Sequence, residues 1–316
     1  MKPTRTLYTG TLALCLSSLG SIAMADGHGP TCGLNTGEAA TGAPILVGGI
    51  NGNAPPGDFS GGTDAAAAYF ACVNANGGIN GQPIEYLVEN DQWNPELAGQ
   101  VATNLVIDQG VVALVGNGSV VEMAVNANLY RDEGVMVMAS GCAISECYES
   151  SNIVSTNQGP LPSGIGALTY AVEELGTQHA ACIGFNIPNN GGWACDWMAD
   201  FMESQGLRGT SILMDPTAVD LNSVYLQALA EGADTILLML PAGPALGLLN
   251  VAEEQGGREM FTWVSPTPLY EPGGTDILAD YWNDDLYIHG EVAPFASDGP
   301  DNQNRLAVMA AYGQEG

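Results

Sequence analysis

The chain has 316 residues, of which 46% are hydrophobic, and it carries 35 acidic residues against six lysines and arginines, a formal net charge of −29. This length favours two domains over one small core. So acidic a surface repels nucleic acid and anionic membranes, which excludes both as partners. The acidic residues are scattered, as in a solvated coat, and do not follow the spacing of a calcium loop. The histidines are too isolated for a zinc site, so we expect neither metal nor cofactor; they are His28, His179 and His289.

Residues 1–25 have the pattern of a secretory signal peptide. Lys2 and Arg5 form a basic start, Leu12–Leu19 is apolar, and Ala23-Met24-Ala25 is a cleavage site, which predicts a mature chain that begins after Ala25. The apolar stretch is far shorter than the ~20 residues of a transmembrane span. Cys15 leaves a lipoprotein signal as an alternative, although the leucine directly before it fits poorly. We expect a soluble protein exported to the periplasm, with four arginines and no lysine left.

Cysteine usage supports export. An even number of cysteines in an exported chain favours disulfides, with ~15 possible pairings of six. The six are Cys32, Cys72, Cys142, Cys147, Cys182 and Cys195. Pairing between sequence neighbours favours Cys142–Cys147 and Cys182–Cys195, and leaves Cys32–Cys72 to fix the amino-terminal tail. Buried free thiols are the alternative.

Strand and helix patterns alternate in the first half of the chain. The expected strands are Ile45–Ile50, Ile84–Val88, Val111–Val115 and Val135–Met138. We expect Thr63 to cap the helix after the first strand, Asn94 followed by Pro95 to start the next helix, and Ser119 to cap the third. Apolar residues recur every four positions in that third helix, at Val121, Val125 and Leu129, and we expect them to form its buried face.

Small and polar residues follow the last two of these strands. They are Gly116-Asn117-Gly118-Ser119 and Ala139-Ser140-Gly141-Cys142-Ala143. In open α/β sheets ligands bind outside the carboxyl ends of the strands, so we expect a small-molecule site here. After a polar break at 151–163 the alternation restarts and continues to Val264. The sequence thus predicts an α/β protein with two doubly wound parallel-sheet lobes.

Several motifs of the first half resemble those of a known family. They are Asn76-Gly77-Gly78-Ile79-Asn80-Gly81, Asn90-Asp91 with Asn94-Pro95, and Asp132-Glu133-Gly134-Val135. They are similar to the periplasmic leucine/isoleucine/valine-binding proteins, which are receptors of ABC importers with the type I periplasmic-binding-protein fold. The similarity runs from about Ile45 to about Glu315.

The resemblance implies two lobes that are joined by a multi-strand hinge and close around a ligand. Residues 26–157 and 292–316 would form lobe I and residues 158–291 lobe II. Segments 153–160 and 288–295 would be the first two crossovers. Because family members continue for several dozen residues more, the resemblance also implies that the carboxyl end, with the third crossover, is missing.

The resemblance implies a ligand site as well. Ser119 matches the position whose hydroxyl meets the ligand carboxylate, and Ser265 stands where these receptors carry a glutamate for the ligand ammonium group. Backbone groups or cleft-lining side chains are expected from Gly118, Gly141, Cys142, Ala143 and Asn190. Candidate cleft aromatics, with core packing as the alternative, are Phe59, Trp93 and Trp193. We therefore expect a small polar ligand with a carboxylate or similar head that is not a standard branched-chain amino acid, unless Asp58 or Glu271 replaces the missing acid.

The expected partners are a small molecule (an amino acid, an amide or a small carboxylate) and the permease subunits of an importer, with the receptor itself a monomer. A sensor of the same fold is the alternative. A dinucleotide-binding enzyme is disfavoured because Val121 stands where the third glycine of the motif belongs. A hydrolase is disfavoured because Ser119 does not lie in a G-x-S-x-G elbow. No catalytic residue is expected.

Overall fold

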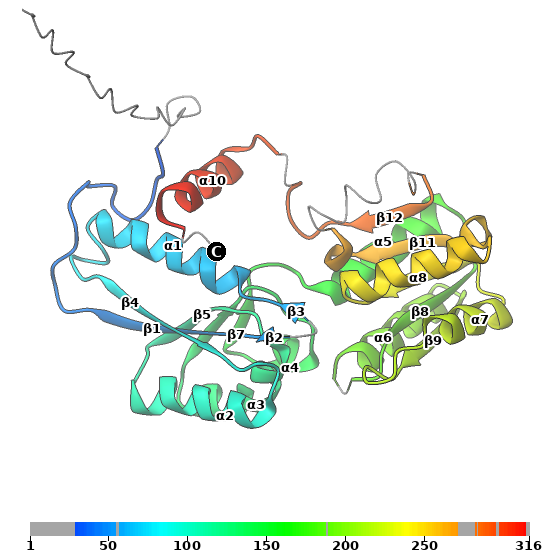
Figure 1. Ribbon diagram of the computed structural model, residues 1–316, viewed down its shortest axis with the longest axis horizontal. Coiled ribbons are helices and arrows are strands. Elements are labelled where there is room, and N and C mark those ends of the chain that lie inside the picture. The colour runs from blue at the N-terminus through cyan, green and yellow to red at the C-terminus, as the bar shows by residue number, and fades with distance from the viewer. Residues whose placement is uncertain are drawn as a thin grey trace, which may run out of the picture.

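A computed structural model describes residues 29–54, 57–187, 189–270, 282, 284–294 and 297–313. The predicted signal peptide, Cys15, His28 and Glu271 lie outside these residues. The described chain forms two parallel β-sheets, each covered by helices on both faces (Figure 1). Among the described helices, none is both long enough and apolar enough to cross a membrane.

The first sheet has the strand order β4-β1-β5-β6-β7. Its strands are β1 Ile45–Asn51, β4 Ile84–Asn90, β5 Ala113–Asn117, β6 Met136–Ala139 and β7 Ile153–Ser155. One face is covered by α1 Gly61–Ala75 and the other by α2 Pro95–Thr103 and α3 Val120–Asp132 (Figure 1). A short antiparallel hairpin, β2 Asn53–Ala54 and β3 Gly57–Asp58, follows β1. The four strands expected in this half all form, with nearly the expected bounds.

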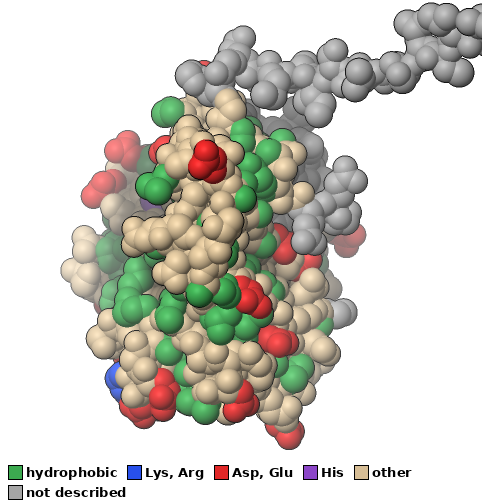
Figure 2. All heavy atoms as spheres, turned by 90° about the vertical axis from the view of Figure 1, so that its left-hand side faces the viewer, with side chains coloured by type: hydrophobic (Ala, Val, Ile, Leu, Met, Phe, Trp, Pro, Cys, Tyr) green, Lys and Arg blue, Asp and Glu red, His purple; other side chains and the backbone are tan. Residues whose placement is uncertain are grey.

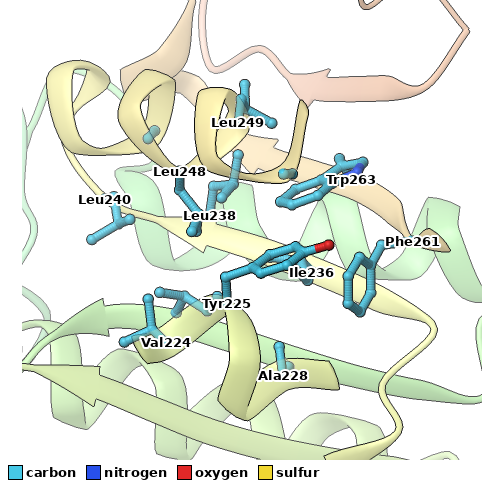
Figure 3. Packing of buried hydrophobic residues seen from close by; sticks show 14 of the residues in the cluster. Val224, Tyr225, Ala228, Ile236, Leu238, Leu240, Leu248, Leu249, Phe261 and Trp263 are labelled. Carbon is cyan, nitrogen blue, oxygen red and sulfur yellow. The ribbon is translucent and has the colours of Figure 1, made fainter. Parts of the chain in front are cut away.

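The second sheet has the strand order β12-β11-β10-β8-β9. Its strands are β8 His179–Phe185, β9 Arg208–Met214, β10 Thr235–Met239, β11 Thr262–Pro266 and β12 Leu286–His289. Its helices are α5 Pro160–Glu174, α6 Gly191–Ser204, α7 Leu221–Glu231 and α8 Ala242–Glu254. Side chains of α7 and α8 pack with Ile236, Leu238 and the fully buried Trp263 on one face of the sheet (Figure 3). Side chains of α5 and α6 form a separate core on the other face.

The chain passes between the sheets more than once. Residues 156–159 lead from β7 into α5, and after β12 the chain returns to α10 Pro300–Tyr312. Helix α10 lies beside α1, and Val308 is buried in the same cluster as Cys72 (Figure 1). The two expected crossovers therefore connect the two sheets, while the lobe boundaries at 157/158 and 291/292 stay a prediction.

The structure confirms two of the three expected helix caps. The Asn94 side chain accepts hydrogen bonds from the N–H groups of Glu96 and Leu97, at 2.9 and 3.0 Å, and Ser119 accepts one from Glu122, at 3.2 Å, so both expected caps are confirmed. The expected cap at Thr63 is wrong. Helix α1 begins at Gly61, so Thr63 lies inside the first turn, where its hydroxyl donates to the Ser60 carbonyl and accepts from the Asn51 amide.

The predicted buried face of α3 is wrong in part, since Leu129 packs against the core but Val121 and Leu129 are only partly buried. Val125 is 45% exposed, whereas the opposite set of residues is buried. The buried set consists of Glu122, Met123, Asn126, Ala127 and Tyr130. Polar side chains in this set find partners inside the protein, as when the Asn126 amide donates to the Ala98 carbonyl of α2 at 3.1 Å. Hydrogen bonding to a neighbouring helix thus outweighs the valine spacing.

Three disulfides join the cysteines in the expected pairs. They are Cys32–Cys72, Cys142–Cys147 and Cys182–Cys195, with Cα–Cα distances of 6.0, 5.7 and 5.4 Å. The first ties the amino-terminal segment to α1, the second closes the loop that contains the first turn of α4 Ser145–Glu149, and the third ties β8 to α6. All six cysteines are buried.

Candidate functional site

Each sheet has a point where its strand order reverses. In the first sheet this point lies between β1 and β5, whose following helices α1 and α3 cover opposite faces (Figure 1). In the second sheet it lies between β8 and β10, which lead into α6 and α8. Ligands of open α/β sheets bind outside the carboxyl ends of the strands at such points. The candidate site is therefore made by the loops that follow these four strands.

Glycines let the backbone come close together at the first of these points. A Cβ atom on Gly62 would lie 2.7 Å from the Gly116 carbonyl oxygen and 2.3 Å from Cβ of Ser140, and one on Gly118 would lie 2.5 Å from the Phe59 carbonyl oxygen. The Gly118 N–H donates to the Ile50 carbonyl at 3.1 Å. Only a residue without a side chain fits at these positions.

We expect Gly62→Ala to destabilise the protein by about 1–3 kcal/mol, because the added methyl group meets backbone that cannot move aside cheaply. Urea unfolding measures the loss. Gly61→Ala is the matched control, since it lies in the same helical turn and a Cβ there meets nothing within 4 Å. An equal effect of the two substitutions would contradict the close packing at Gly62.

The hydroxyl of Ser119 is engaged inside the protein. It donates to Oδ2 of Asp91 and accepts from the Glu122 N–H at 3.2 Å, and both Ser119 and Asp91 are fully buried. The other oxygen of Asp91 accepts from the Trp93 N–H at 2.9 Å. Burial raises the pKa of the Asp91 carboxyl. The expected contact between Ser119 and a ligand carboxylate stays a prediction, and in this structure Asp91 takes that hydroxyl.

A second buried acid, Glu122, lies behind Ser119. The Tyr130 hydroxyl donates to its Oε1, Asn117 lies beside it, and it is fully buried. The pKa of Glu122 is raised to about 8, mainly by burial and also by the nearby Asp91 charge, while the hydrogen bonds to Tyr130 and Asn117 act in the opposite direction. The sequence interpretation missed this group. The pattern that reveals it is a glutamate, an asparagine and a tyrosine at steps of four, which places Glu122, Asn126 and Tyr130 on one helical face.

The two predicted aromatics of the first lobe form one unit. The Trp93 indole N–H donates to the carbonyls of Ala54 and Gly57, at 2.9 and 3.0 Å, so Trp93 fixes the β2–β3 hairpin. Phe59 packs edge-on against Trp93, with ring centroids 5.2 Å apart, and is 50% exposed. Trp93 therefore has a structural role, and Phe59 presents an aromatic surface beside the carboxyl end of β1. Asp58, the suggested substitute acid, accepts from the Ser60 N–H at 2.9 Å.

The backbone after β6 meets the second lobe directly. The Ala143 carbonyl accepts a hydrogen bond from the Asn190 side chain at 2.6 Å, so the structure brings two predicted site residues together. The Cys142 carbonyl accepts from the Tyr148 hydroxyl at 3.0 Å, and Gly141 is half-buried. Whether these groups contact a ligand stays a prediction.

Ser265 does not offer its hydroxyl to the space between the lobes. It is fully buried and donates to the Pro266 carbonyl at 2.9 Å. An acid that the sequence interpretation missed, Glu291, lies nearby in the chain segment after β12. Its carboxylate accepts from the Gly159 N–H at 2.9 Å, and its own N–H donates to the Thr267 hydroxyl at 2.7 Å. Glu291 thus links the two crossovers, and burial raises the pKa of its carboxyl.

Basic side chains are scarce in this protein. Acidic groups are spread over the end of the first lobe among neutral and hydrophobic ones (Figure 2). The four described arginines are engaged with Asp132, Glu231, Asp285 and Asn302, away from the carboxyl ends of the site strands. The described residues contain no group of three or more side chains that could hold a metal ion. The described site therefore depends on backbone groups, neutral polar side chains and the Phe59 ring, and not on a basic side chain, to contact a solute.

This two-lobed α/β architecture is the type I periplasmic-binding-protein fold. A family model described as "Periplasmic binding protein" matches residues 44–316, so the chain belongs to that family. It is a binding protein and not an enzyme. The match does not establish membership of the narrower leucine/isoleucine/valine-binding group that the motifs suggest. No curated protein matches the sequence.

Solved structures of similar fold include several solute receptors. One is an ABC transporter solute-binding protein from R. palustris in complex with 4-hydroxybenzoate, 20% identical, with a TM-score of 0.69 over 86% of this chain and 74% of that one. A fatty acid ABC transporter substrate-binding protein from Thermomonospora curvata is 18% identical, with a TM-score of 0.69 over 89% of this chain and 74% of that one. A third, from R. palustris in complex with benzoate, is 15% identical, with a TM-score of 0.66 over 86% and 74%. At these identities the likeness concerns the fold.

Proposed function

We propose that this protein is the extracytoplasmic solute-binding receptor of an ABC importer, which captures a small polar solute between its lobes. The observation that carries the proposal is the arrangement of its two sheets, whose carboxyl-end loops make direct contact through Ala143, after β6, and Asn190, after β8. A solute held there would contact both lobes and favour their closure. The partners would be the solute and the permease subunits of the importer, with the receptor acting as a monomer in the periplasm.

For the ligand we propose a small carboxylate or its amide, with an aromatic or apolar body. Structural neighbours that bind benzoate and 4-hydroxybenzoate support this class. Within this chain, Phe59 offers an exposed ring, and the turn that starts α3 carries N–H groups of the kind that bind anions without a basic side chain. Because the Ser119 hydroxyl already donates to Asp91, the ligand carboxylate or amide would bind beside Ser119 through the backbone N–H groups of that turn.

A branched-chain amino acid fits the site poorly. Its ammonium group needs an acid, but the Ser265 hydroxyl is buried against Pro266, and the Glu291 carboxylate is bonded to Gly159. Burying the ammonium group without a counter-charge costs several kcal/mol of binding free energy. Every ~1.4 kcal/mol corresponds to about a tenfold change in affinity.

Calorimetry with a small panel tests the ligand class. The panel pairs benzoate and 4-hydroxybenzoate with benzamide, and sets them beside leucine, isoleucine and valine. We expect at least one carboxylate or amide to bind at micromolar or better affinity, and the three amino acids to bind at least about 100-fold more weakly. Sub-micromolar leucine binding would contradict the proposed class. If Ser119→Ala binds the preferred compound unchanged, Ser119 is not its anchor.

A further inference from the structure

Two short segments from different lobes make polar contact. One runs from the end of β6 into α4, and the other leads from β8 into α6. Besides the bond from Asn190 to the Ala143 carbonyl, the Ser145 N–H donates to the Asn189 carbonyl at 3.1 Å. The Asn189 side chain donates to Oε1 of Glu146 at 2.7 Å. Three hydrogen bonds, two of them to backbone carbonyls, therefore bridge the lobes at one place.

An aromatic pair extends the same contact. The rings of Tyr148 on α4 and Trp193 on α6 lie with their centroids 5.7 Å apart. The Tyr148 hydroxyl donates to the carbonyl of Cys142 or Gln158, at 3.0 and 3.1 Å, so the ring is held by its own loop and by the first crossover. Burial raises the pKa of Tyr148 to about 12, so the hydroxyl remains a donor at neutral pH. The ring pair adds apolar contact to the hydrogen bonds.

A disulfide fixes each of the two segments separately. Cys142–Cys147 closes the loop that presents Ala143 and Ser145, and Cys182–Cys195 ties β8 to the helix turn that carries Trp193. A surface whose shape is fixed beforehand loses less conformational entropy when it makes a contact. Each half of the contact is thus held in shape by a disulfide within its own lobe.

We propose that these two segments form an interlobe latch, which holds the lobes together and slows their separation. We define the latch as residues 142–148 with residues 189–193. The latch is a contact of the protein with itself, so it exists independently of the identity of any ligand. Its consequence, slower ligand release, rests on the proposed function.

Hydrogen exchange at the Ser145 N–H tests the latch, because its acceptor, the Asn189 carbonyl, belongs to the other lobe. In ligand-free protein we expect Asn190→Ala and Trp193→Leu each to speed exchange of peptide 143–149 about fivefold, the effect of losing one hydrogen bond or a comparable contact. Two substitutions in the same lobe serve as matched controls. Trp197→Leu changes a 52% exposed tryptophan of the same helix, and Asn222→Ala changes an asparagine bonded only within its lobe, to Gln255. Both controls should leave the exchange unchanged.

Removing the loop disulfide gives an independent test. We expect Cys142→Ala/Cys147→Ala to speed exchange of peptide 143–149, whereas Cys32→Ala/Cys72→Ala, which removes a disulfide outside the latch, should not. The proposal is overturned if Asn190→Ala and Trp193→Leu leave this exchange unchanged, or if the controls speed it equally. No ligand enters the experiment, so a failed latch and a failed receptor function give different results.

Discussion

Replacing Glu122 by glutamine is expected to remove much of the pH dependence of stability between about pH 5 and pH 8. The Glu122 pKa rises from 4.5 to about 8 in the folded protein, so the folded state holds a proton that the unfolded state releases. The stability from this group is complete below pH 4.5 and is lost as the pH rises to about 8. At about 1.4 kcal/mol per pKa unit, the free energy of unfolding falls on the order of 4 kcal/mol over this range.

The prediction is checked by urea unfolding at a series of pH values. Asp91 faces Glu122 from the loop after β4, and its raised pKa adds a dependence of the same sign, as does that of Glu291 at the crossovers. A smaller slope should therefore remain in Glu122→Gln. Glu133→Gln, on an exposed residue at the end of the same helix, is the control and should keep the full slope. An unchanged slope in Glu122→Gln would show that Glu122 is ionised in the folded protein at neutral pH.

Removing the Cys182–Cys195 disulfide is expected to lower the free energy of unfolding by about 3 kcal/mol. The two cysteines are 13 residues apart, and in the chain-entropy model a loop of that size gives a stabilisation of about 3 kcal/mol. Cys142–Cys147, with a separation of 5, should contribute about 2 kcal/mol, and Cys32–Cys72, with a separation of 40, about 4 kcal/mol.

Paired cysteine-to-alanine variants, unfolded in urea without reductant, measure these differences. Non-reducing peptide mapping of protein isolated from the periplasm provides the control, because it shows directly which cysteines are joined. Free thiols at both Cys182 and Cys195 would reject the pairing. Equal losses from all three pairs would instead show that loop length does not set the stabilisation.

Short-range signals predicted the architecture well. Asn94, Pro95 and Glu96 specify a helix start through groups within one turn, and the structure has that start. The alternation of apolar strands with helical segments was enough to predict two parallel sheets, because each strand–helix unit must bury its own apolar face. Cysteine pairing by proximity also held, since two of the three disulfides join neighbouring elements.

Features that depend on distant partners were not predictable in this way. The Ser119 cap was predicted, but its bond to Asp91 was not, because 28 residues separate the two. The valines of α3 suggested the wrong face, because groups that act on the buried Glu122, namely Asn117 and Asp91, lie outside the helix. Likewise the Asn190–Ala143 bond spans 47 residues and two lobes, so residues assigned by resemblance to a ligand also bind each other.

The central claim is that a solute is captured between the lobes, and small-angle scattering tests it most directly. The radius of gyration is measured with and without a saturating amount of the panel compound that calorimetry identifies as the best ligand. Capture between the lobes predicts a smaller radius with the compound bound, because contacts with both lobes favour the closed arrangement. A compound that binds tightly at one-to-one stoichiometry yet leaves the radius unchanged would contradict the claim.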